Sequence, residues 1–115
     1  MTPKEVIAQA NASQGPVLIF AQSAQSAQDI AMQVEPLASV LYKGMGMDNV
    51  ESEIQRFRTG EVDIIVCDKA YMIGVNLCRD DRQYVQVLWC YAPSPEQKAQ
   101  GEGRVNWFPL TEPNS

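Results

Sequence analysis

The sequence predicts an α/β domain with three layers, in which helices cover both faces of a mostly parallel sheet of about five strands. Apolar runs of strand length alternate along the chain with segments of helical periodicity. The runs are apolar throughout, which is typical of strands buried on both faces of a parallel sheet. A length of 115 residues fits one domain with its own core. We expect that domain to span residues 1–115, with a frayed tail at 111–115.

The amino-terminal half contains two predicted helices and two predicted strands. Thr2, followed by a proline and soon by a glutamate, is typical of an N-cap and predicts a helix over 3–10. An apolar run at 16–20 predicts the first strand, and Ser23 is the expected N-cap of the second helix. The next strand is expected at 39–42. Three apolar residues mark the buried face of the second helix: Ala27, Ile30 and Val34.

The carboxyl-terminal half begins with a third predicted helix. Asp48 and Glu51 form a D-x-x-E pattern that is close to a capping box. Val50, Ile54 and Phe57 follow at helical spacing and form its expected core face. The remaining predicted elements are strands at 62–67 and 85–90, a short helix at 96–101 and a short edge strand at 105–110.

Composition excludes several classes of site. The net charge of −5 argues against independent nucleic-acid binding, because phosphate contacts come mainly from lysine and arginine. The chain has no histidine, so it cannot build a histidine metal site or a Ser–His or Cys–His pair. The three cysteines form no C-x-x-C pattern, and we expect buried free thiols rather than a metal or redox site.

The sequence also bears on location and on nucleotide binding. No apolar run approaches the roughly 20 residues of a membrane span, and the first residues lack the apolar core of a signal peptide, so we expect a soluble, cytoplasmic protein without a membrane partner. No G-x-x-x-x-G-K-[ST] phosphate loop occurs. The strand that ends at Asp68 is similar to a Walker B strand, but without that loop we interpret it as a core strand.

Two segments resemble motifs of superfamily-two motors. Residues 68–77 resemble motif V in the form found in SWI/SNF-type translocases, with five matching residues: Lys69, Ala70, Gly74, Asn76 and Leu77. Residues 93–104 resemble motif VI, with three residues on its pattern: Gln100, Gly103 and Arg104. Residues 17–23 resemble motif IV. The resemblance covers about residues 15–108 and implies the second, RecA-like motor domain of these helicases and translocases, the helicase C-terminal domain.

The resemblance implies a split ATP site. In that family the first motor domain holds ATP, and the second offers arginines to the γ-phosphate. Arg104 would be that arginine, positioned by Gln100, with Gly74, Asn76 and Gly103 beside the nucleotide. Trp107 stands where a second arginine is expected, and its alternative role is packing beside Phe108. The alternative for Arg104 is a surface arginine after a glycine turn.

The resemblance also implies nucleic-acid contacts at the ends of predicted strands. The candidates are Ser23, Lys43, Gly44 and Lys69, and the alternative for each is an ordinary polar loop. ATP and magnesium are expected only where a partner supplies the phosphate loop, and DNA binding by this chain alone is expected to be weak.

Three functions remain open at this stage. The first is a helicase-like domain that acts with, or on, a partner motor ATPase as its regulator, without hydrolysing ATP itself. The second is the separated half of an active DNA helicase or translocase, in which Arg104 contacts the nucleotide bound by the partner. The third, by default, is an unrelated small α/β enzyme.

Overall fold

In the part of the chain that the structure describes, the sheet contains four strands that all run parallel, in the order β2-β3-β1-β4. The computed structural model describes residues 2–34, 38–68 and 77–106. In this part of the chain the elements are α1 Pro3–Ala12, β1 Val17–Ala21, α2 Ala24–Gln33, β2 Ser39–Leu41, α3 Met47–Arg58, β3 Ile64–Asp68, β4 Gln86–Trp89 and α4 Pro95–Asn106.

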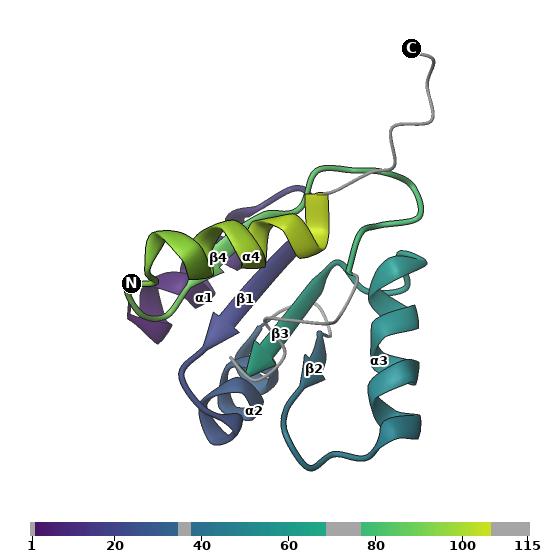
Figure 1. The fold of residues 1–115 in the computed structure, drawn as a ribbon, viewed down its shortest axis with the longest axis horizontal. Coiled ribbons are helices and arrows are strands. Elements are labelled where there is room, and N and C mark those ends of the chain that lie inside the picture. Colours follow the sequence, from purple (N-terminus) through teal and green to yellow (C-terminus); the bar gives the residue numbers. More distant parts are fainter. Residues whose placement is uncertain (1, 35–37, 69–76, 107–115) are drawn as a thin grey trace.

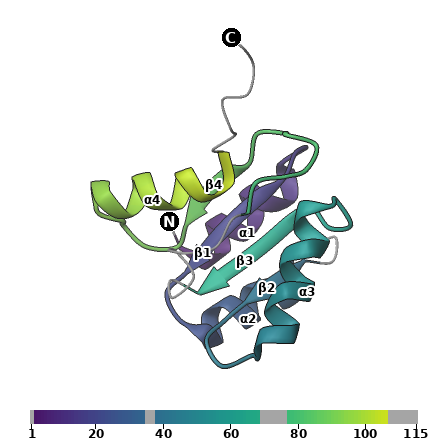
Figure 2. The ribbon, with the colours of Figure 1, turned by 45° about the vertical axis from the view of Figure 1, so that its right-hand side comes forward.

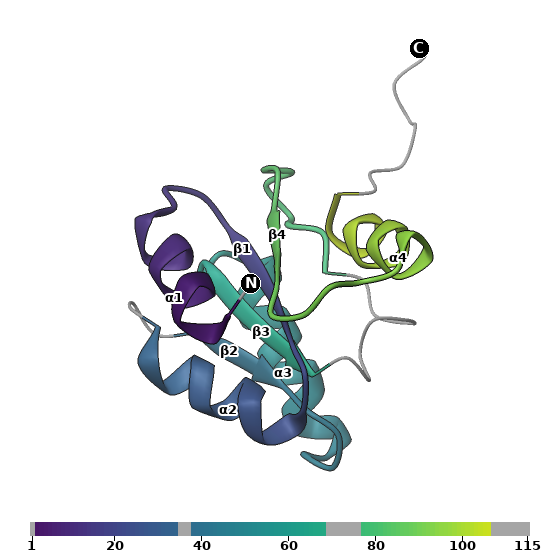
Figure 3. The same cartoon turned by 90° about the vertical axis from the view of Figure 1, so that its left-hand side faces the viewer.

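The three expected layers are present. Helices α1 and α2 cover one face of the sheet and α3 covers the other (Figure 1). Helix α4 lies on the side of the sheet away from α1 (Figure 3). The predicted α/β fold with a parallel sheet and helices on both faces is therefore confirmed.

Alternation along β1 divides the core between the two faces. Val17 and Ile19 point to the α1 and α2 side, where they meet Val6 and Ile30. The intervening side chains point to the α3 side, where Phe20 stacks on Trp89 with ring centroids 4.6 Å apart. All five residues of β1 are buried, as expected for a central strand that is covered on both faces.

Helix starts follow the sequence at two places and depart from it at a third. Thr2 and Glu5 form a reciprocal capping box at α1, and the Ser23 hydroxyl accepts a hydrogen bond from the Ser26 N–H at α2. The expected capping box at Asp48 and Glu51 is wrong. The N-cap of helix α3 is Gly46, two residues earlier than Asp48, so the helix starts at Met47, and this glycine makes no side-chain cap. Asp48 therefore lies inside the first turn, where its negative charge interacts favourably with the positive end of the helix dipole.

Helix α4 corrects the prediction for the carboxyl-terminal part of the chain. The predicted helix at 96–101 starts at Pro95 and continues to Asn106. The Ser94 hydroxyl accepts from the Gln97 N–H at 3.1 Å, and the Gln97 side chain accepts from the Ser94 N–H at 3.0 Å. This pair is a capping box. The expected edge strand is therefore wrong at 105–106, which are helical, and its remaining positions, 107–110, lie outside the described residues.

The state of the cysteines agrees with the expectation from composition. Cys67, Cys78 and Cys90 are free thiols, and all three are buried. Burial raises the pKa of the Cys67 thiol, with a smaller contribution from the neighbouring Asp68. In the part of the chain that the structure describes, no helix has the length and apolar character needed to cross a bilayer.

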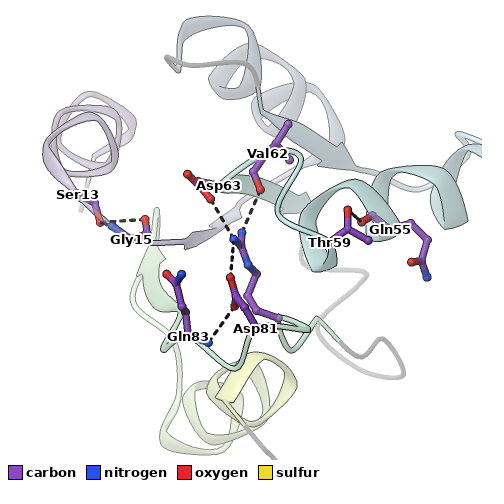
Figure 4. A network of polar contacts seen from close by, with 9 residues as sticks. Ser13, Gly15, Gln55, Thr59, Val62, Asp63, Asp81 and Gln83 are labelled. Carbon is purple, nitrogen blue, oxygen red and sulfur yellow. Dashed lines mark hydrogen bonds and ion pairs between the residues drawn. The ribbon is translucent and has the colours of Figure 1, made fainter.

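A buried arginine ties together the amino ends of the strands. Arg79 bridges Asp63 at 3.1 Å and Asp81 at 3.3 Å and donates to the Val62 carbonyl at 3.1 Å. Figure 4 shows the Val62, Asp63 and Asp81 oxygens converging on this guanidinium. The guanidinium also lies over the Phe57 ring, 5.3 Å from its centroid. These contacts join α3, β3 and the segment that leads into β4.

Candidate functional site

The carboxyl ends of the strands meet at one edge of the sheet. In register, Ala21 of β1 pairs with Asp68 of β3, and Leu41 of β2 pairs with Cys67. The segments that follow β1 and β2 therefore leave the sheet at the same edge, one on each side of β3 (Figure 2). Ligands of open α/β sheets bind at this edge. Three of the four candidate nucleic-acid residues lie here and are exposed: Ser23, Lys43 and Gly44.

Ser23 has a structural task as well as a candidate binding role. Its hydroxyl is 3.1 Å from the Ser26 N–H, and its carbonyl accepts from the Ala27 N–H at 2.9 Å. The side chain therefore occupies one of the orphan donors at the start of α2. The remaining N–H groups of this first turn carry the positive end of the helix dipole, which favours an anion such as a phosphate.

The turn after β2 depends on glycine. Gly44 has φ +97° and Gly46 has φ +92°, a region that side-chain-bearing residues rarely adopt. The Met45 N–H donates to the Tyr42 carbonyl at 3.4 Å, which closes the turn. Lys43 projects from this turn as an exposed cation at the carboxyl edge. The positive φ of Gly44 thus gives a conformational reason for glycine at this position.

The candidate nucleotide residues lie on a different element. Gln100, Gly103 and Arg104 belong to α4, where residues three and four positions apart share one face. Gln100 is exposed. The alternative of a glycine turn before Arg104 is wrong, because Gly103 is helical. The structure therefore places Gln100, Gly103 and the backbone of Arg104 on one side of a continuous helix.

The structure separates the two sets of candidates. Helix α4 follows β4 at one side of the sheet, whereas Lys43 and Gly44 follow β2 at the other. Three strand spacings of about 4.8 Å lie between β2 and β4, so these two strands are roughly 14 Å apart across the sheet. Four further residues lie outside the described residues: Lys69, Gly74, Asn76 and Trp107.

A polar and aromatic group at the carboxyl end of β3 and β4 was not anticipated as a unit. Asp68 is only 7% exposed at the end of β3. Burial, and after it the charges of Asp68 and Cys90, raises the pKa of the Tyr91 phenol, which therefore stays protonated. Trp89 packs edge-on to Tyr91 with centroids 5.8 Å apart. Trp89 and Tyr91, two aromatic residues two positions apart at the end of the predicted strand 85–90, were the sequence signal for this cluster.

The same cluster contains two buried polar atoms, the Trp89 Nε1 and the Tyr91 hydroxyl oxygen. Neither has a hydrogen-bond partner among the residues that the structure describes. Among the described residues, no three histidine, cysteine, aspartate or glutamate side chains lie close enough to hold a metal ion. Asp68 therefore does not belong to a metal-ligating cluster within that part of the chain.

The chain matches the profile of a known protein family. The profile of the family described as helicase conserved C-terminal domain matches residues 2–106. The match spans every helix and strand described above. No curated protein matches the chain.

Proposed function

Because the chain belongs to the family of helicase conserved C-terminal domains, we propose that it acts with or on an ATPase motor domain in nucleic-acid metabolism. That motor domain, on this polypeptide or another, supplies the phosphate loop that residues 1–115 do not contain. In this proposal ATP and magnesium bind the phosphate-loop domain, and the present chain closes on them from outside. In this proposal the protein works in the cytoplasm.

The observation that carries the proposal is the continuous helix α4. A helix holds residues 100, 103 and 104 on one face with fixed spacing. The Ser94–Gln97 capping box anchors the start of that helix. A guanidinium held on a rigid element stabilises charge that develops on a transferring phosphoryl group. Arg104 is the proposed donor, and Gln100, one turn earlier, is the proposed positioning residue.

Regulation of a partner motor is the form of this function that we favour. The chain carries a net charge of −5, and Trp107 stands where the motif places a second arginine. Tryptophan cannot replace an arginine at a phosphate, because it offers one neutral donor. The alternative is the separated half of an active helicase or translocase, in which Arg104 contacts the nucleotide directly.

The proposed nucleic-acid contact is weak and local. Ser23, Lys43 and Gly44 offer a helix N-terminus, one cation and an exposed turn at the carboxyl edge. The proposed site includes Lys69, Gly74 and Asn76 from the motif V resemblance. With so few cations, binding by this chain alone should fall steeply as salt rises and should add affinity mainly when the motor domain is bound.

The decisive experiment mixes the chain with a phosphate-loop motor domain from a superfamily-two helicase and measures DNA-stimulated ATP hydrolysis. Stimulation supports the active half, and inhibition supports the regulator. Arg104→Ala should abolish stimulation, lowering the rate about 10³-fold or more if Arg104 acts as an arginine finger. Lys98→Ala, an exposed cation on the same helix, is the matched control and should leave the rate unchanged. Neither stimulation nor inhibition by the wild-type chain, with no binding in a pull-down, would falsify the proposal.

A second variant separates the two forms. Trp107→Arg restores the arginine pair of the motif. An increase in ATPase with the supplied motor domain marks Trp107 as a lost arginine and favours the active half. An unchanged rate, with inhibition retained, favours a surface used for regulation.

A further inference from the structure

The outer edge of β2 carries backbone donors that face away from the sheet. Among the described residues, β2 is an edge strand that pairs with β3 alone. Alternate N–H groups of a parallel strand point to opposite sides. The Val40 N–H donates to a side chain of α3, so it points outward, and the next outward donor is the Tyr42 N–H. Unpaired groups of this kind are a template for pairing with another strand.

Glu53 occupies the first of these donors. Its Oε1 accepts from the Val40 N–H at 3.0 Å, while its Oε2 lies 3.1 Å from the Arg56 guanidinium. Arg56 is held in turn by Glu61 at 2.9 Å. Burial lowers the pKa of Arg56, but the hydrogen bonds to Glu53 and Glu61, together with the charges of these two carboxylates, outweigh burial and raise that pKa. Arg56 and Glu61 therefore hold the Glu53 carboxylate of α3 against the edge of β2. Figure 2 shows α3 beside this strand.

Met45 occupies the second donor. The Tyr42 N–H lies 3.3 Å from the Met45 Sδ. A thioether is a weak acceptor, so the hydrogen bond at the Tyr42 N–H is weaker than the one from the Val40 N–H to Glu53. Both outward N–H groups thus meet side chains of the same chain, one from α3 and one from the turn before it.

The surface next to this edge favours association. An open groove of about 320 Å³ lies between α2 and β2, and its lining consists of Gln28, Ala31, Met32, Ala38, Val40 and Tyr42. Met32 is 82% exposed. A strand added to β2 would place alternate side chains over this groove and bury it. An apolar groove beside an exposed edge is an association site unless the edge is blocked.

We propose that Glu53 closes the β2 edge to strand addition by a second copy of this chain. Every copy presents the same short strand and groove, so a two-fold antiparallel pair would bury both grooves at once. In that pair each Glu53 carboxylate would meet the backbone carbonyls of the other strand, and its own hydrogen bond to Val40 would be lost. Glu53 therefore opposes the pair on both sides of the interface.

The test compares Glu53→Ala with Glu51→Ala by sedimentation velocity over a range of concentrations. Glu51 is exposed on the same helix, so it is matched for charge and helix position. Glu53→Ala should dimerise at a concentration at least about tenfold lower than the wild type, and Glu51→Ala should match the wild type. Equal association of the two variants overturns the proposal.

Two more variants locate the contact. Glu53→Ala with Met32→Lys places a charge beside the groove and should return association to the wild-type level; association that persists places the contact elsewhere and overturns the proposal. Glu53→Gln keeps an acceptor for the Val40 N–H, and it should associate less than Glu53→Ala.

If Glu53→Ala does not fold, amide exchange at the Val40 N–H in Glu53→Gln decides. Protection equal to that in Glu51→Ala supports the capping contact, and loss of protection overturns it.

Discussion

The two ends of the sheet are held by different kinds of contact. At the amino end, hydrogen bonds from Arg79 and Arg58 join residues 17, 20 and 22 positions apart in the sequence. At the carboxyl end, the caps and turns join residues only three or four positions apart, as in the pairs Ser23–Ser26 and Met45–Asn49. Long-range polar contacts tie separate elements together, whereas local ones shape a single turn.

Because of this difference, we expect the amino end to contribute to the global stability of the fold and the carboxyl end to open locally. Segments held by local contacts open at low free-energy cost, and binding segments are drawn from that class. The candidate residues Ser23, Lys43 and Gly44 all lie at the locally held end. Variants at the amino end should therefore change the global free energy of unfolding, and variants at the carboxyl end should act locally.

Removal of Arg79 should have the largest effect. Arg79→Ala leaves the Val62 carbonyl without its donor and removes the cation from the Phe57 ring. We expect a loss of about 3 kcal/mol in the free energy of unfolding, measured by urea denaturation. Lys43→Ala at the opposite end should change it by less than about 0.5 kcal/mol. Arg79→Met keeps the stem, and a stability equal to the wild type would mean that the polar contacts contribute nothing net.

Gly60 should tolerate a side chain poorly. Its φ is +89°, and a Cβ atom there would lie 3.1 Å from an Arg79 nitrogen. Gly60→Ala should cost about 1–2 kcal/mol of stability from the backbone conformation. Gly15→Ala is the matched control, because a Cβ atom at Gly15 meets nothing within 4 Å. Equal thermal midpoints for the two variants would contradict the strain expected from the backbone conformation at Gly60.

Ser23 should show the local behaviour of the carboxyl end. Ser23→Ala removes the N-cap of α2 and should cost about 1 kcal/mol. Amide exchange should rise mainly in the first turn of α2 rather than across the sheet. Ser26→Ala keeps the N–H that Ser23 caps and serves as the control. Exchange that rises equally in β1 and β3 would argue against an independently opening carboxyl end.

Acid should weaken the amino end through Asp81. The Gln83 N–H and then Arg79 lower the pKa of this carboxyl. A lowered folded-state pKa stabilises the fold above the unfolded value of about 3.9. That contribution is lost as pH falls through the folded-state value. Asp81→Asn should flatten the pH dependence of unfolding below about pH 4, and Glu51→Gln should not.

Local patterns in the sequence were sufficient for most elements of the fold. The apolar runs at 16–20 and 62–67 became β1 and β3, and Thr2 and Ser23 cap the helices that they were expected to cap. Val50 and Phe57 are buried on α3 as the helical spacing predicted. These features depend on a residue and its near neighbours, so sequence alone can identify them.

Other features were missed because they depend on contacts or on context. Two glycines in 101–103 argued for a short helix, yet α4 continues to Asn106. Glycine lowers helix propensity by only about 1 kcal/mol, which other interactions overcome. The Arg79 contacts were not predicted, because no local pattern relates a side chain to partners in separate elements. The same holds for the bond between Glu53 and the Val40 N–H.

The sequence by itself determined the α/β class, the buried character of the strands, the family motifs and the absence of a phosphate loop from residues 1–115. Only the tertiary structure decided the strand order, the separation of α4 from the turn at Lys43 and Gly44, and the closed edge of β2. The reason is physical. Periodicity and caps reflect energies within one turn or strand, whereas strand order and edge contacts reflect packing between elements that are distant along the chain.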